Sequence, residues 1–158
     1  MTTARTKIGM PSADPAPSAT AGRSPTDAEL ERLRELFGSY PEVAGVWLFG
    51  SHARGAATTR SDLDLAVDPA VPEARTRKLD LLTDLVTAGF ENVDLVILPS
   101  DDPVLRFEAI GPNRLVYAAP GYDAAEAFVQ ALRHYDDTAR LRRIVRDAYY
   151  DRQLRDDG

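Results

Sequence analysis

One short stretch of the chain brings together residue types that bind phosphate. It reads "LFGSHARGAATTRSDLDLAV" and contains a Gly-Ser pair, Gly50 and Ser51, followed ten residues later by two aspartates. Glycine lets the backbone approach a phosphate closely, and a serine at a helix N-terminus offers its hydroxyl and unpaired backbone amides to an anion. Arg54 lies one turn later and could neutralise phosphate charge. The stretch is therefore a candidate phosphate-binding turn.

The two aspartates, Asp62 and Asp64, are two positions apart in a segment with the pattern of a strand. Strand residues two apart point to the same face, so both carboxylates project together while Leu63, Leu65 and Val67 face a core. A solvated strand face gives the same alternation, and for an isolated pair of aspartates that is the commoner interpretation. Two like charges on one face gain nothing from each other, whereas a shared divalent cation makes the pair favourable.

A third acidic residue, Asp94, lies in the later strand-like segment "NVDLVILP". If the two strands are neighbours, their backbones lie about 4.8 Å apart and Asp94 can join the first two carboxylates. The chain has no cysteine, so a metal here must bind oxygen or histidine. Carboxylate oxygens suit Mg²⁺, which completes its coordination with water and nucleotide phosphate. The sequence thus offers Asp62, Asp64 and Asp94 as candidate metal ligands and catalytic carboxylates, and Gly50, Ser51 and Arg54 as candidates for binding the phosphates of a nucleotide.

Hydrophobic periodicity indicates the elements that position these residues. Residues 1–25 hold four prolines and almost no large apolar side chain, which predicts a disordered N-terminal tail. Residues 26–155 are predicted to form one domain, and its first helix begins near Thr26, with Glu29 at capping-box spacing. Strands are expected up to Phe49 and at 62–67, at "NVDLVILP" and at "RLVYA"; helices are expected at 72–90, 104–110 and 123–154. This order predicts an α/β (α+β) fold, a small mixed β-sheet flanked by helices with a long C-terminal helix.

Composition limits the classes of function. A chain of 158 residues with 44% hydrophobic residues suits one globular core, and no apolar run approaches the ~20 residues of a membrane span. We expect a soluble, cytoplasmic protein with no membrane association. The net charge of −6 argues against direct nucleic-acid binding, which normally needs clustered positive charge.

The full pattern is more specific than its parts. G-S-x10-D-x-D, preceded by an apolar strand and followed by a strand with an acidic residue, resembles the nucleotidyltransferase superfamily related to DNA polymerase beta. The closer similarity is to the minimal nucleotidyltransferase (MNT) antitoxins of HEPN/MNT toxin–antitoxin systems, and it covers residues 27–152. It rests on "GSHARG", "SDLDLAVD", "VDLVIL" and "PVLRFEAIGPNRLVYAAPGYDAAEAFVQALRHYDD".

The resemblance implies a nucleotidyltransferase fold and a role for each motif residue. Asp62 and Asp64 would bind Mg²⁺, Gly50 and Ser51 would hold the triphosphate, and Asp94 would ligate a metal or activate the acceptor hydroxyl. It further implies an antitoxin that transfers AMP from ATP to a tyrosine of a cognate HEPN ribonuclease toxin. The alternatives are an antitoxin that acts by binding alone, and a nucleotidyltransferase that modifies a small molecule or RNA.

The last predicted helix carries arginines on more than one face. Arg140, Arg142, Arg143 and Arg146 are partly balanced by neighbouring aspartates, which indicates a solvated surface. Contact with a toxin is the alternative interpretation of these residues. The apolar positions expected along this helix include Phe128, Leu132, Tyr135, Leu141, Ile144 and Val145.

Overall fold

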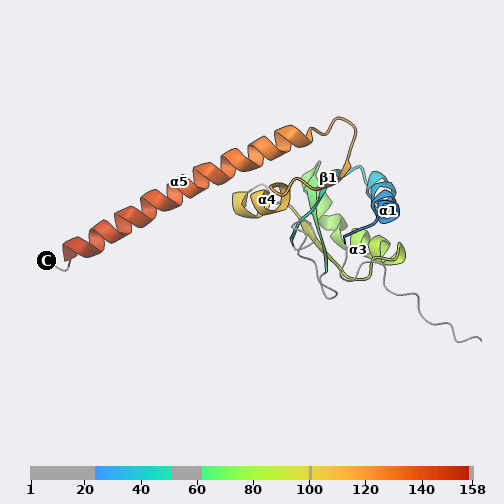
Figure 1. Cartoon of the computed structure of the whole chain (residues 1–158), viewed down its shortest axis with the longest axis horizontal. Coiled ribbons are helices and arrows are strands. Elements are labelled where there is room, and N and C mark those ends of the chain that lie inside the picture. The colour runs from blue at the N-terminus through green and yellow to red at the C-terminus, as the bar shows by residue number, and fades with distance from the viewer. Residues whose placement is uncertain (1–23, 51–61, 100, 157–158) are drawn as a thin grey trace, which may run out of the picture.

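The computed structural model describes residues 24–50, 62–99 and 101–156, with side chains as far as Asp147. Helices and strands follow one another in the predicted order, and the long helix α5 extends away from the body (Figure 1). The elements are α1 (Asp27–Gly38), β1 (Val43–Leu48), β2 (Leu63–Pro69), the 3-10 helix η1 (Pro72–Arg77), α3 (Lys78–Thr87), β3 (Val93–Ile97), α4 (Pro103–Ile110), β4 (Leu115–Ala118) and α5 (Ala124–Asp156).

The four strands form one mixed sheet in the order β3-β2-β1-β4. β1 runs antiparallel to β2 and β4, whereas β2 and β3 are parallel and are connected through η1 and α3. The two aspartate-bearing strands are therefore neighbours, which is the condition under which Asp94 was expected to join Asp62 and Asp64. The small mixed sheet flanked by helices, with a long C-terminal helix, confirms the predicted fold class.

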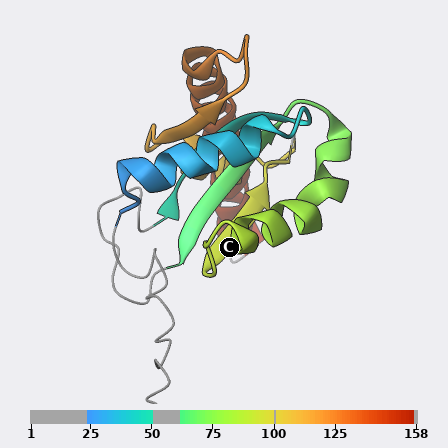
Figure 2. The same cartoon turned by 90° about the vertical axis from the view of Figure 1, so that its right-hand side faces the viewer.

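Helices cover both faces of this sheet. On one face, Leu63, Leu65 and Val67 pack against Phe37 of α1 and Leu85 of α3, and Figure 2 shows these two helices in front of the strands. On the opposite face, a second apolar cluster joins the sheet to α4 and the start of α5; it includes Trp47, Ala66, Ala109, Ile110 and Ala131.

The second cluster corrects one expectation from the strand pattern. The aspartate side of β2 was predicted to face solvent, but Ala66 and Asp68 on that side are buried. The reason is that α4 and α5 lie over this face. Asp64, nearer the start of β2, remains partly exposed, so only one end of this face is accessible.

Helix α1 begins as predicted. Thr26 is its N-cap, and its hydroxyl accepts a hydrogen bond from the backbone N–H of Glu29 at 3.3 Å. The Glu29 carboxylate accepts one in return from the backbone N–H of Thr26 at 2.7 Å. This reciprocal capping box satisfies two amides that the helix itself cannot pair.

Residues 72–90 form a 3-10 helix followed by α3 rather than one continuous helix. Two apolar rows run along α3, and the sheet packs against the row of Leu81 and Leu85. Leu79 and Val86 belong to the other row and are 75% and 54% exposed. Periodicity identified the helix but could not choose between the two rows.

Helix α5 has 33 residues and a length of about 50 Å. Its first half packs on α4 and the sheet, whereas the rest projects beyond the body (Figure 1). None of the described helices, α5 included, combines the length and the apolarity that a membrane span requires.

Candidate active site

The candidate residues gather at one edge of the sheet. β1 ends where β2 begins, because Leu48 pairs with Leu65. β2 and β3 begin side by side, with Leu63 opposite Val93. Gly50, which follows β1, and the three aspartates at the starts of β2 and β3 therefore meet at the same edge. Segments that are far apart in the sequence supply them.

Two of the carboxylates are direct neighbours across the sheet. Asp64 of β2 and Asp94 of β3 are register partners in the parallel pair, which places their backbones about 4.8 Å apart with both side chains on the same face. Asp94 is exposed and Asp64 is partly buried. Asp62 immediately precedes β2 and is exposed. All three carboxylates are accessible to a ligand from this edge.

Gly50 lies against Asp64. The backbone of Gly50 has φ +65°, and a side chain there would collide with the Asp64 carboxylate, whose Cγ lies 2.8 Å from the ideal Cβ position. The preceding residue ties the turn to the same aspartate, because the Phe49 N–H donates to the Asp64 carbonyl oxygen at 3.0 Å. Glycine is required here both for the backbone conformation and for the close approach.

The rest of the predicted phosphate-binding turn lies outside the described residues. Ser51 and Arg54 fall in that stretch, so their roles in holding a triphosphate stay predictions. The described half of the motif, Gly50 with Asp62 and Asp64, is the part that the sheet positions directly.

The donor set fits a hard divalent cation in complex with a nucleotide. Within the described residues, no three acidic or histidine side chains form a ready-made group of metal ligands. Mg²⁺ commonly binds through one or two protein carboxylates and completes its coordination with water and substrate phosphates. Asp64 with Asp62 or Asp94 can supply such a partial set, and the side-chain-free Gly50 leaves room beside it.

A buried polar network lies on the same face of the sheet, towards the other end of β2, and holds α4 against it. Sequence reasoning missed this network. Arg106 of α4 makes a bidentate ion pair with Asp68, with N–O distances of 3.0 and 2.9 Å. The hydroxyl of Tyr122 donates to the same carboxylate at 2.8 Å and accepts from Trp47 Nε1 at 3.2 Å. The network joins two strands of the sheet to α4 and to the segment before α5. The alternation that singled out Asp62 and Asp64 extends to Asp68, which was the available signal.

The network raises the pKa of Tyr122 and accounts for the glycine at position 45. Burial, followed by the charge and the hydrogen bond of Asp68, raises the pKa of Tyr122 well above its usual value. Gly45 of β1 lies under this ring, and its ideal Cβ position is 2.6 Å from Tyr122 Cε1. A side chain at position 45 would displace the tyrosine that completes the network.

A comparison with models of protein families identifies the family of this chain. The family model described as polymerase beta, nucleotidyltransferase matches residues 31–120, a range that includes the whole sheet and the candidate residues. A comparison with curated protein sequences finds no match.

Several solved structures share the fold. A chain of a toxin–antitoxin complex with AMP-PNP is 24% identical with a TM-score of 0.63, and the match covers 75% of this chain and 96% of that one. A chain of the MntA–HepT toxin–antitoxin complex is 22% identical with a TM-score of 0.60, covering 78% and 97%. A chain of the complex between a tri-AMPylated Shewanella oneidensis HEPN toxin and an MNT antitoxin is 22% identical with a TM-score of 0.58, covering 75% and 93%.

Proposed function

Because this chain belongs to the polymerase beta nucleotidyltransferase family, we propose that it is the MNT antitoxin of a HEPN/MNT toxin–antitoxin pair. In this proposal it is a protein adenylyltransferase that transfers AMP from ATP to a tyrosine hydroxyl of its cognate HEPN ribonuclease toxin and so neutralises the toxin. The observation that carries the proposal is the pairing of Asp64 with Asp94 beside Gly50. Similar solved structures hold an ATP analogue or an AMPylated toxin, which supports the choice of donor and acceptor.

The residues at the sheet edge can account for each part of the proposed AMP transfer. The acceptor oxygen forms a bond to the α-phosphorus of ATP, the bond from that phosphorus to the pyrophosphate breaks, and Asp94 takes up the hydroxyl proton. Asp62 and Asp64 would hold Mg²⁺ with its nucleotide, and Gly50, Ser51 and Arg54 would bind the triphosphate. Bound Mg²⁺ would neutralise phosphate charge and lower the pKa of the acceptor hydroxyl.

The described architecture favours an acceptor that belongs to another protein. After β4, the described chain contributes only α5, which leads away from the candidate edge rather than closing over it (Figure 1). Asp94 is exposed. Among the residues that the structure describes, none encloses this carboxylate, which suits a side chain presented by a second protein better than a small molecule that must be enclosed.

Intact-mass measurement tests the proposal. The probe is the cognate HEPN toxin of the proposed pair, to be sought as the product of a gene next to the one for this chain, and it is incubated with this protein, ATP and Mg²⁺. We expect the toxin to gain AMP on tyrosine, with fragment spectra locating the residue and ribonuclease activity falling in step. A double variant, Asp62→Asn with Asp64→Asn, is the matched control and should leave the toxin mass unchanged.

The two other functions give different results in this experiment. A toxin that is neutralised without gaining mass, equally by the wild type and the double variant, would establish contact alone as the mechanism. Labelled AMP found on a small molecule or on an RNA end, with the toxin unmodified, would replace the protein acceptor. Either result would overturn the proposal.

A further inference from the structure

The long helix α5 divides into two parts with different surroundings. In the first part, Ala127 and Ala131 are buried against α4 and the sheet. This packing extends to Tyr135, whose ring stacks on Phe107 of α4 with centroids 4.5 Å apart. Beyond this contact the helix continues away from the body (Figure 1). We call the segment from Ala139 to Asp147 the α5 arm.

The α5 arm carries an apolar stripe that the described residues of the chain leave exposed. Leu141, Ile144 and Val145 are 60%, 55% and 61% exposed, and their spacing of three and four residues puts them on one side of the helix. At 3.6 residues per turn, this side lies about a quarter of a turn from the face of Ala127, Ala131 and Tyr135. Leu141 and Ile144 therefore lie off the face that packs on α4, and Val145 lies at its margin, in line with Ala127.

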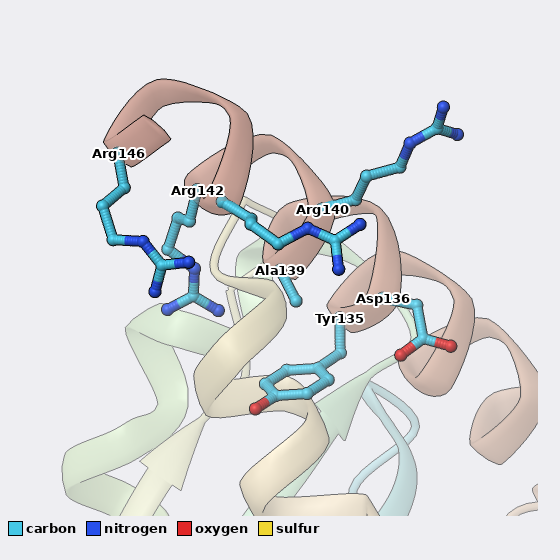
Figure 3. A pocket seen from close by; sticks show the side chains of 7 residues that line it. Tyr135, Asp136, Ala139, Arg140, Arg142 and Arg146 are labelled. Atoms are coloured by element: carbon cyan, nitrogen blue, oxygen red, sulfur yellow. The ribbon is translucent and has the colours of Figure 1, made fainter. Parts of the chain in front are cut away.

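Arginines border the stripe on both sides. Arg140 lies on one flank and points away from Tyr135, whereas Arg142 and Arg146 lie on the same side of the helix as Tyr135 (Figure 3). The Arg142 guanidinium carbon is 6.0 Å from the centre of the Tyr135 ring. Together with Arg143, these side chains line a hollow along the arm. Asp136 also lines this hollow and Asp147 pairs with Arg146 at 3.4 Å, so the surface combines exposed aliphatic groups with an excess of positive charge.

We infer that the α5 arm is the docking surface for the toxin, and that it binds an apolar groove of the partner bordered by acidic side chains. This inference rests on the proposed function. Exposed aliphatic groups gain free energy when a partner removes them from water, and the bordering arginines add attraction to an acidic rim. A nucleic acid would use the arginines but would leave the stripe between them uncovered.

Charge distinguishes this partner from a second copy of the chain. Two arms paired antiparallel through their stripes would bring Arg140 and Arg142 of one copy against the arginines of the other. Like charges across an interface oppose association. The arrangement therefore favours a partner of opposite local charge over self-association.

The test compares two sets of exposed apolar residues. The arm variant is Leu141→Gln, Ile144→Gln and Val145→Gln, because glutamine keeps a high helix propensity. The matched control changes Leu79→Gln and Val86→Gln, which are similarly exposed on α3. Calorimetry with the cognate HEPN toxin should show at least about a 100-fold weaker affinity for the arm variant and less than about a three-fold change for the control. Mg²⁺–ATP binding and circular dichroism should match the wild type for both.

A charge-reversed variant, Arg140→Glu with Arg142→Glu, should also weaken toxin binding and reduce its salt dependence. Unchanged toxin affinity in the arm variant would overturn the inference while leaving the proposed function intact. A wild-type dimer that the arm variant converts to a monomer would show that a second copy occupies the stripe. Binding of a short RNA that the charge-reversed variant loses, with toxin binding retained, would show a nucleic-acid surface. A wild-type protein that binds no toxin would instead refute the proposed function.

Discussion

Asp64 and Asp94 face the same side of the sheet from directly paired positions on two parallel strands. The parallel register fixes their relation, because α3 returns the chain from the end of β2 to the start of β3 at the same edge. Two carboxylates at one register position repel each other unless a cation or a proton lies between them. This placement is consistent with the proposed roles, in which Asp64 holds the nucleotide complex and Asp94 receives a proton.

Asp94→Asn should separate chemistry from binding. Because the amide cannot accept the acceptor proton, the rate of AMP transfer should fall by about 10²–10⁴-fold. The Kd for Mg²⁺–ATP, measured by calorimetry, should change by less than about ten-fold. Asp64→Asn should impair both quantities. The control is Glu91→Gln, an exposed acid just before β3, which should leave both near wild type. Equal losses of binding and transfer in Asp94→Asn would contradict the separation.

Gly50→Ala should disable transfer through a steric effect. Alanine at φ +65° is strained by about 1–2 kcal/mol, and its methyl group would also displace the Asp64 carboxylate. Gly121→Ala is the matched control, because Gly121 has φ +84° and nothing within 4 Å of its ideal Cβ position. Urea unfolding should show a similar loss of stability in both variants. Transfer should fall by more than about 100-fold only in Gly50→Ala. A similar loss of transfer in both would mean that backbone strain, rather than the collision, is responsible.

Local sequence signals predicted the elements of this fold well. The Thr26–Glu29 capping box and the order of elements along the chain follow from patterns within a few residues. The alternation in each strand also indicates that Asp64 and Asp94 can meet if β2 and β3 are neighbours, and the sheet meets that condition. Ser51 and Arg54 remain predictions, since they lie outside the described residues.

The features that sequence patterns could not predict depend on contacts between distant segments. Asp68 meets Arg106 and Tyr122 across 38 and 54 residues, and no periodicity encodes such a pairing. Periodicity likewise reports that Leu141 and Ile144 share a side of α5, but it cannot report whether anything covers them. Burial is decided by which neighbours reach a surface, and the part of the chain that the structure describes leaves the stripe of the α5 arm exposed.

The Arg106–Asp68 ion pair supports a prediction about stability. Arg106→Met would leave the Asp68 carboxylate buried without its charge partner, which should lower the free energy of unfolding by about 3–5 kcal/mol. Adding Asp68→Asn to Arg106→Met removes the unpaired charge, so the double variant should be more stable than Arg106→Met alone. Arg146→Met, which breaks an exposed ion pair with Asp147, should cost less than about 1 kcal/mol. Urea unfolding measures all three, and equal small effects would show that the network is not a structural anchor.

Tyr40 couples stability to alkaline pH. Burial, followed by a 2.5 Å hydrogen bond that its hydroxyl donates to Asp84, raises the pKa of Tyr40 from 10.0 to about 12. The folded state therefore favours the neutral phenol, and this contribution is complete below pH 10 and is lost as pH rises from 10 towards about 12. The pKa of Tyr122 is also raised, so its ionisation lowers the free energy of unfolding in the same direction, at still higher pH. In Tyr40→Phe, the free energy of unfolding should consequently decline less steeply between pH 10 and 12 than in the wild type. Urea unfolding across that range checks this, and parallel pH profiles for the two proteins would contradict it.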